Sequence, residues 1–199
     1  MDRILSLFIA IFALSLIGCA QERPYQVTNL ILGSQLQGRG YITEEIELGL
    51  QVSDMRTNQH IGYRRFGFEK ESPIHLDNVA PAMLKTLTED LKQLGFQPVS
   101  YGVLNKRSMD VQILSVHYDK KARVVAGEEK IIIKADVVVK KEEQYLQRSF
   151  EISHVDNDFF KPSATHQNQQ IDETLSRSLE KIIHKIVNDG QIIAFLRGY

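Results

Sequence analysis

The chain has 199 residues with 24 basic and 25 acidic side chains, and its formal net charge is −1. This balance excludes a strong electrostatic pull on nucleic acid or anionic lipid, so we expect no nucleic-acid partner. The chain has a single cysteine, Cys19, so an internal disulfide is excluded. A metal site or a nucleophile based on cysteine is also excluded if the thiol of Cys19 is alkylated.

An apolar run opens the chain. Residues 4–16 follow Arg3 and hold only two polar residues, both serine. The run is shorter than the roughly 20 apolar residues of a membrane-spanning helix and is typical of a signal peptide. Leu16 and Gly18 in front of Cys19 resemble the lipobox of bacterial lipoproteins, whose cysteine receives a diacylglycerol before the leader is removed. This resemblance implies signal cleavage between Gly18 and Cys19 and lipidation of Cys19, which anchors the protein to a membrane.

The residue after the lipidated cysteine indicates the destination. In the sorting rule of such lipoproteins an aspartate there retains the protein in the inner membrane, whereas this chain has Ala20. We therefore expect a lipid-anchored protein of the cell outer membrane that faces the periplasm. The sequence predicts a signal peptide over 1–18, a lipidated cysteine with a short tether over 19–26, and a single α+β domain over 27–199.

Strand patterns dominate the next stretch. Residues 27–32 (VTNLIL) form a candidate first strand. Residues 45–53 alternate apolar and polar side chains, which predicts a half-buried strand. The turn-forming residues 54–59 then predict that 61–68 return as its hairpin partner.

Two features of this region resemble binding motifs. Gly38-Arg39-Gly40 lacks the spacing of a phosphate-binding loop, so we interpret it as an ordinary loop. Arg64 and Arg65 are adjacent on a predicted strand and point to opposite faces, so we interpret this segment as a strand with at least one solvent-facing arginine and not as an anion clamp.

A helix is predicted from Asn78 onward, with Pro81 in its first turn. Its apolar stripe repeats at spacings of three and four residues and consists of Leu84, Leu87, Leu91 and Leu94. Gly95 suits a left-handed helix end, and Phe96 begins the chain reversal into a strand.

The second half of the chain predicts three strands and a helix. The strands cover 109–118, 130–140 and 145–155, and their short polar connections indicate an antiparallel meander. The helix covers 163–190 and precedes a final apolar turn over 192–196. The fold class is therefore α+β, with a mainly antiparallel sheet and two amphipathic helices packed on one face.

Four features together resemble the YajG family of bacterial lipoproteins. They are the lipobox, the helix end Leu94-Gly95-Phe96, the strand segment Ala135-Asp136-Val137, and the last helix closing on Asp189 before Phe195-Leu196. The resemblance covers most of the mature chain and implies the fold, but it brings no catalytic residues.

No side-chain constellation indicates an enzyme. Ser178 and Lys181 match the Ser-x-x-Lys pattern of penicillin-interacting enzymes, but Ser-Asp-Asn and Lys-Thr-Gly are missing from the chain. His154, Asp156 and Asp158 lie near a strand end and could bind a metal. His117 and Asp119 would join this hypothetical metal cluster if their strands were neighbours, and imidazole with carboxylate ligands would suit zinc. We expect a solvated loop there, and therefore no catalytic residues, no metal and no cofactor.

Two non-catalytic functions remain. The favoured hypothesis is a lipid-anchored adaptor or accessory subunit that docks an envelope protein through an open sheet face or a free strand edge. Its open face would carry Lys130, Lys134, Asp136 and Lys140. The alternative is a periplasmic protein that binds a cell-wall fragment or a lipid between sheet and helices, as the largely apolar strand 109–118 would permit.

Overall fold

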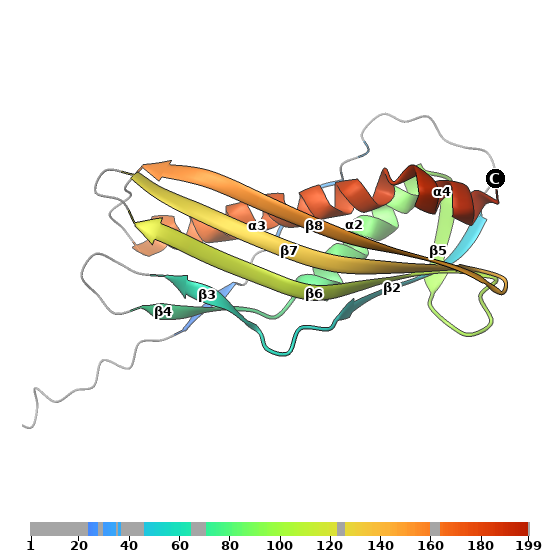
Figure 1. Cartoon of the computed structure of the whole chain (residues 1–199), viewed down its shortest axis with the longest axis horizontal. Coiled ribbons are helices and arrows are strands. Elements are labelled where there is room, and N and C mark those ends of the chain that lie inside the picture. The colour runs from blue at the N-terminus through green and yellow to red at the C-terminus, as the bar shows by residue number, and fades with distance from the viewer. Residues whose placement is uncertain are drawn as a thin grey trace, which may run out of the picture.

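The computed structural model describes residues 24–27, 30–34, 36, 46–64, 71–122, 126–159 and 164–198. Within them the chain forms eight strands and three helices in an elongated α+β arrangement (Figure 1). The strands are β1 (Tyr25–Val27), β2 (Ile46–Asp54), β3 (His60–Arg64), β4 (Ser72–Leu76), β5 (Phe96–Ser100), β6 (Arg107–Ala122), β7 (Ala126–Lys141) and β8 (Gln144–Phe159). The helices are α2 (Val79–Gln93), α3 (Ala164–Val187) and α4 (Gly190–Arg197).

The larger sheet is mixed and has the strand order β5-β2-β6-β7-β8. β2 is parallel to both β5 and β6, whereas the β6-β7 and β7-β8 pairs are antiparallel. The prediction of a mainly antiparallel sheet is therefore only partly right. The reason is that α2 lies between β2 and β5 in the chain, and a helical crossover returns the second strand parallel to the first.

The predicted antiparallel meander is present, with strands of 16 residues each. β7 and β8 stay in register from Lys141–Gln144 at the turn to Ala126–Phe159 at the far end. Glu142 has a positive φ of 57° in the two-residue turn between them, as tight hairpin turns require.

The helices follow the predicted positions with one correction. α2 ends at Gln93, and Gly95 adopts a φ of 80° directly before β5, as the helix-end pattern predicts. The predicted helix 163–190 is α3, which ends at Val187. The predicted final apolar turn over 192–196 is instead a third helix, because the Asp189 carboxylate accepts hydrogen bonds from the backbone N–H groups of Gln191 and Ile192 and so begins α4. The described residues therefore hold three helices, where the sequence predicted two.

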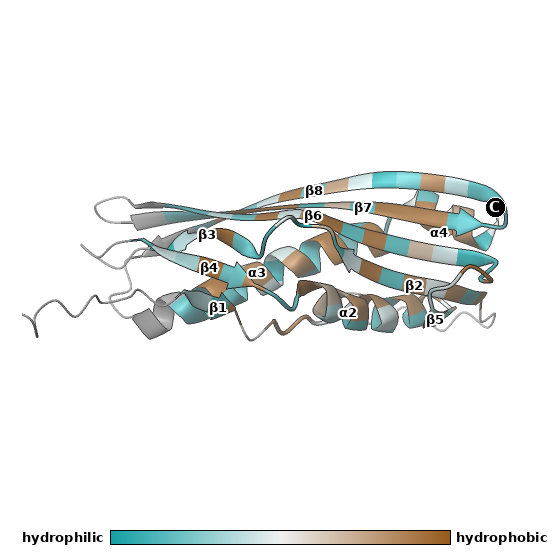
Figure 2. Ribbon diagram, turned by 90° about the horizontal axis from the view of Figure 1, so that it is seen from below, coloured by the Kyte–Doolittle hydropathy of each residue, from teal (hydrophilic) through white to brown (hydrophobic). Residues whose placement is uncertain are grey.

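The core lies between the larger sheet and the helices (Figure 2). Ile131, Ile133 and Val137 of β7 are completely buried, and the intervening residues Lys134 and Asp136 are not. α3 contributes an equally buried stripe, with no solvent exposure at Leu175, Leu179, Ile182, Ile183 and Ile186. One face of the sheet is thus dry and the other is open to solvent.

The smaller sheet has the order β1-β4-β3, with β1 parallel to β4 and β3 antiparallel to it. The predicted hairpin between β2 and β3 is therefore wrong, since β3 pairs with β4. The predicted strand 27–32 is also displaced, because β1 covers only Tyr25–Val27 and residues 30–32 are not in a strand. β3 packs against β6, where Gly62 lies so close that an added Cβ would come within 2.1 Å of the Tyr118 carbonyl oxygen.

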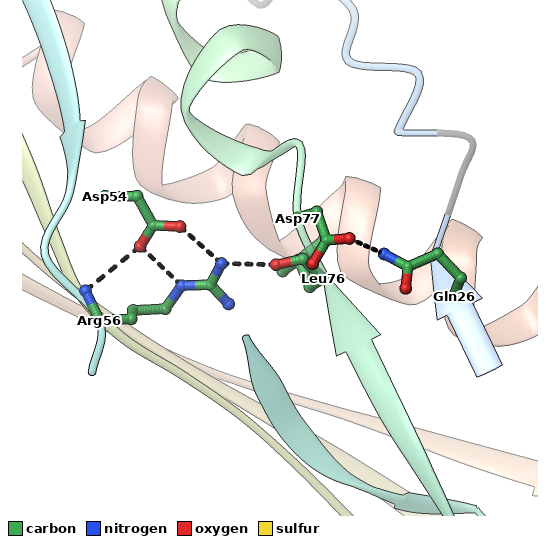
Figure 3. Close-up of polar contacts among 5 residues, drawn as sticks. All are labelled: Gln26, Asp54, Arg56, Leu76 and Asp77. Carbon is green, nitrogen blue, oxygen red and sulfur yellow. Dashed lines mark hydrogen bonds and ion pairs between the residues drawn. The ribbon is translucent and has the colours of Figure 1, made fainter. Parts of the chain in front are cut away.

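Arg56 joins the two sheets (Figure 3). Its guanidinium donates to the Asp54 carboxylate at the end of β2, with an Nη2–Oδ2 distance of 2.7 Å. It also donates to the Leu76 carbonyl oxygen at the end of β4, at 2.6 Å. Gln26 of β1 in turn donates to Asp77, the residue after Leu76, so a series of hydrogen bonds connects the end of β2 to the end of β4 and then to β1. These bonds fix the smaller sheet against the body.

In the part of the chain that the structure describes, no helix has the length and apolarity needed to cross a membrane.

Candidate docking surface

β8 is an edge strand of the larger sheet, because β7 pairs with it on one side and no described strand pairs with it on the other. It is 16 residues long, well above the five to six of an ordinary strand. A long edge presents unpaired backbone N–H and C=O groups to which another strand can bind. This makes β8 the leading candidate for a docking site.

The hairpin turn determines which backbone groups of β8 face outward. Lys141 and Gln144 flank the two-residue turn and form its closing, hydrogen-bonded pair. Even-numbered residues of β8 therefore bond to β7, and odd-numbered residues direct their N–H and C=O groups to the free edge. The carbonyl of Glu151 agrees with this assignment, because it accepts a hydrogen bond from Lys185 of α3 at 2.9 Å.

Lys185 divides the free edge. Its ammonium occupies a backbone carbonyl of the edge strand, and a lysine at a sheet edge opposes the addition of a further strand there. The segment from Tyr145 to Ser149, on the side of the hairpin turn, is separated by this contact from the segment beyond Glu151. Tyr145, Gln147 and Ser149 are exposed, and Tyr145 retains 67% of its accessible surface. The edge of residues 145–149 is the part that we call the β8 edge site.

Basic side chains of α3 lie along the other half of β8. Lys181 contacts Nδ1 of His154 at 2.7 Å, and Arg177 pairs with Asp156 at 3.0 Å. Burial, followed by the positive charge of Lys181, lowers the pKa of His154 below its usual value of 6.5. The imidazole is therefore neutral at pH 7, and its Nδ1 is the acceptor for the lysine.

The open face of the sheet carries cross-strand polar pairs. Lys134 of β7 and Glu151 of β8 form an ion pair at 3.2 Å, and Gln147 donates to Asp136 at 3.1 Å. The predicted alternation of β7 is confirmed, since Lys130, Lys134, Asp136 and Lys140 are all more exposed than their buried neighbours. Exposed ion pairs of this kind contribute roughly 0.2–1 kcal/mol each, so a partner can replace them at small cost.

The hypothetical metal cluster is not assembled. β7 lies between β6 and β8, and His117 and Asp119 are on the open face, whereas His154 and Asp156 are on the face that meets α3. Among the described residues no group of three or more His, Cys, Asp or Glu side chains is arranged to hold a metal ion. The side chain of Asp158 lies outside the described residues.

Ser178 and Lys181 do not form a catalytic pair. The Ser178 hydroxyl is completely buried and donates to the Thr174 carbonyl one turn earlier in α3, at 2.6 Å. Lys181 instead points to His154 on β8. A nucleophile without solvent access cannot attack a substrate. The match to the Ser-x-x-Lys pattern is therefore made by a serine that is part of the buried side of α3 and not of a catalytic site.

β1, the strand nearest the predicted anchor, is fixed to α3. The Tyr25 hydroxyl donates to Asp172 at 2.7 Å, and the Arg64 guanidinium lies 4.8 Å from the centre of the Tyr25 ring. Burial and the hydrogen bond to Asp172 raise the pKa of Tyr25, and burial raises the pKa of Asp172. The predicted cleavage and lipidation residues Gly18 and Cys19 lie outside the described residues, as do residues 38–40 and Arg65.

The sequence indicated an open face or a free edge but not which strand supplies the edge. The exposed odd residues of 145–155 alternate as in any half-buried strand, and a terminal strand gives no separate signal. The role of Lys185 could not be predicted from the sequence either, because its ammonium donates to a backbone carbonyl of a different element, that of Glu151 in β8.

Comparison with known proteins places the chain in a family. Residues 39–197 match the sequence model of a family described as "Uncharacterized lipoprotein". No curated protein matches the chain.

Several solved structures are similar to the chain. A protein of the DUF330 family from Xanthomonas campestris has 10% sequence identity and a TM-score of 0.52, with 87% of this chain and 97% of that chain covered. The rare lipoprotein B of Shewanella oneidensis has 9% identity and a TM-score of 0.47, with 77% and 99% covered. Lipoprotein GNA1162 of Neisseria meningitidis has 9% identity and a TM-score of 0.31, with 69% and 99% covered. At such identities the first of these shows the fold alone.

Proposed function

Because the chain belongs to the family of uncharacterized lipoproteins that its residues 39–197 match, we propose that it is a lipid-anchored adaptor of the cell envelope that docks a partner protein through the β8 edge site. This membership confirms the resemblance to the YajG lipoproteins. A lipoprotein associates with a membrane through its lipid anchor. The following observations support the position of that anchor and the docking of a partner protein.

The anchor in this proposal is Cys19. Residues 1–18 act as the signal peptide, cleavage follows Gly18, and the thiol of Cys19 carries the lipid in the outer membrane, with the body facing the periplasm. Residues 20–24 connect the anchor to β1 and reach about 17 Å at roughly 3.3 Å per extended residue. A partner bound by the folded body, the single domain over 27–199, is therefore held next to the membrane.

The observation that carries the adaptor proposal is the free edge of β8. Residues 145–149 offer three consecutive outward-facing backbone positions, and the open face beside them is polar. An extended segment of a partner that pairs with this edge gains main-chain hydrogen bonds, and the side chains of the open face select it.

The alternative, a small-ligand carrier, requires space between sheet and helices. Met109, Val111 and Ile113 of β6 are completely buried there, and their neighbours Asp110 and Gln112 face the other side, so the strand is buried on one face only. The groove of about 440 Å³ beside Ile152 and Lys181 and the hollow of about 260 Å³ beside His60 and His117 open at the surface. The complete burial of Met109, Val111 and Ile113 between sheet and helices favours the adaptor over the carrier.

The test compares Ser149→Pro with Ser149→Ala. The N–H of Ser149 faces the free edge, so proline removes one docking donor without breaking a bond to β7, while alanine keeps the N–H and removes only the hydroxyl. Each variant is expressed as the full chain, crosslinked briefly in native envelopes, solubilised in mild detergent and captured, and the co-purifying proteins are identified by mass spectrometry.

We expect one partner near one-to-one stoichiometry with the wild type and with Ser149→Ala, and at least a tenfold loss with Ser149→Pro, since a lost interface hydrogen bond and a steric clash together cost roughly 1.4 kcal/mol or more. Thermal unfolding of both variants verifies that the body remains folded. Equal capture by all three chains, or capture of no protein, would overturn the adaptor proposal.

A further inference from the structure

An exposed apolar turn projects from one end of the molecule. The β5–β6 connection, residues 101–106, presents two consecutive aliphatic side chains, and Val103 and Leu104 retain 91% and 97% of their accessible surface. Single exposed apolar side chains are common on protein surfaces, but two adjacent large ones at the tip of a turn form an apolar patch of the kind that marks a contact site. Tyr101, at the start of the same turn, is also exposed.

The turn is held in place by hydrogen bonds and by a glycine of β2. The Gly102 N–H donates to Oδ1 of Asn105 at 2.6 Å, and the Asn105 N–H donates to the Gly102 carbonyl at 3.2 Å. Asn105 rests on Gly49, where an added Cβ would lie 2.4 Å from Asn105 Oδ1. Val103 and Leu104 are therefore presented by an ordered turn, so contact with a surface requires little further loss of conformational freedom.

The position of the turn relates it to the predicted anchor. β1, which follows the tether, and β5 lie toward opposite ends of the long axis (Figure 2). The β5–β6 and β2–β3 connections both project from the lower side of the view in Figure 1. The β2–β3 connection carries Met55, which is 58% exposed. Two connections on one long side of the molecule thus each contain an exposed apolar residue.

The residues that flank the tip indicate its occupant. Tyr101 precedes it and the exposed Lys106 follows Asn105, whereas Arg107 donates to the Leu196 carbonyl oxygen of α4 at 2.8 Å. An aliphatic tip between a tyrosine and a lysine is the composition of segments that sit at a membrane interface, where aromatic rings lie at the headgroups and cations contact phosphates.

We propose that Val103 and Leu104 insert into the surface of the lipid bilayer and form a second membrane contact. The proposal rests on the lipid anchor at Cys19, which holds the tip at a high effective concentration over the membrane, so that two weakly binding side chains suffice. The 16-residue strands extend roughly 50 Å at about 3.3 Å per residue, so attachment near both ends lays the body along the membrane.

The absence of tryptophan from the chain permits a direct test. Leu104→Trp introduces a single fluorophore at the tip, and Val155→Trp introduces one on β8, where the native valine is 47% exposed. Each full-length lipidated chain is reconstituted into vesicles of phosphatidylethanolamine and phosphatidylglycerol, with and without lipids that carry a quencher in the acyl chains. Flotation of the vesicles measures anchoring separately from insertion of the tip.

We expect both variants to float with the vesicles. Only the tryptophan at position 104 should show an emission that is blue-shifted relative to buffer, and the acyl-chain quencher should quench it several-fold more strongly than the tryptophan at position 155. Equal, water-like emission from both positions in floated protein would overturn the second contact while leaving the anchor intact. Protein that fails to float would instead refute the anchor. A tip that stays unquenched in vesicles but crosslinks to a protein in native envelopes would assign Val103 and Leu104 to a protein partner and likewise overturn the proposal.

Discussion

The contact between the smaller sheet and β6 depends on Gly62, and Gly62→Ala tests it. An added Cβ would lie 2.1 Å from the Tyr118 carbonyl oxygen, 3.0 Å from its carbonyl carbon and 3.2 Å from its Cβ. Ordinary contact begins near 3.4 Å. The overlapping atoms belong mostly to the backbone of a central strand, so they cannot rotate away, and β3 must move outward by about an ångström or more.

The expected cost follows from two contributions. Overpacking of a filled interface costs roughly 1–3 kcal/mol. Outward movement of β3 also withdraws Ile61, which is 2% exposed, from part of a burial that is worth roughly 1.5–3 kcal/mol when complete. We therefore expect Gly62→Ala to lower the free energy of unfolding by about 3 kcal/mol, which corresponds to a Tm decrease of about 6–12 °C for a domain of this size.

The assay is urea unfolding followed by circular dichroism, with thermal unfolding as a second readout. Gly190→Ala is the matched control, because no heavy atom lies within 4 Å of its added Cβ and the residue begins α4. Its stability should be unchanged or higher by up to about 1 kcal/mol. If Gly62→Ala unfolds at the same urea concentration as the wild type, the close packing of β3 on β6 is refuted.

Three further predictions concern the anchor and the contacts of α3. Cys19→Ala should block lipidation and leave an uncleaved or mislocalised precursor, and normal fractionation of this variant with membranes would contradict the lipobox interpretation. Tyr25→Phe removes the hydrogen bond to Asp172 and should lower the free energy of unfolding by about 1–2 kcal/mol, measured with urea. The pKa of His154 is lower in the folded chain than its usual 6.5, so its contribution to stability is complete above that pH, and stability should fall as the pH decreases from about 7 toward 5, because the unfolded chain gains the proton first. His154→Gln should remove this component of the pH dependence, and an unchanged profile would show that another group causes it.

Local signals in the sequence predicted the local elements of the fold. The end of α2 was predicted because Gly95 has the left-handed conformation that glycine permits, and the meander was predicted because its turns are short and its strands alternate. The helical form of the final apolar segment was harder to predict, since Asp189-Gly190 is compatible with both a helix end and a new N-terminus. The carboxylate of Asp189 in fact caps α4.

Partner choice between distant strands was not predictable from these signals. The pattern of residues 45–53 fixes which face of β2 is buried, but it is the same for a strand that pairs with β3 and for one that lies between β5 and β6. The edge position of β8 likewise depends on the order of the whole sheet. For the same reason His117 and His154, which the sequence allowed on one face, lie on opposite faces.

Site-specific photocrosslinking tests the adaptor proposal most directly. A photoreactive amino acid replaces Gln147, which is exposed on the β8 edge site, and in a parallel chain it replaces Lys85, which is exposed on α2. After irradiation of living cells, we expect one discrete crosslinked envelope protein from position 147 and none from position 85. Absence of a protein crosslink at 147, or the same products from both positions, would contradict docking through β8.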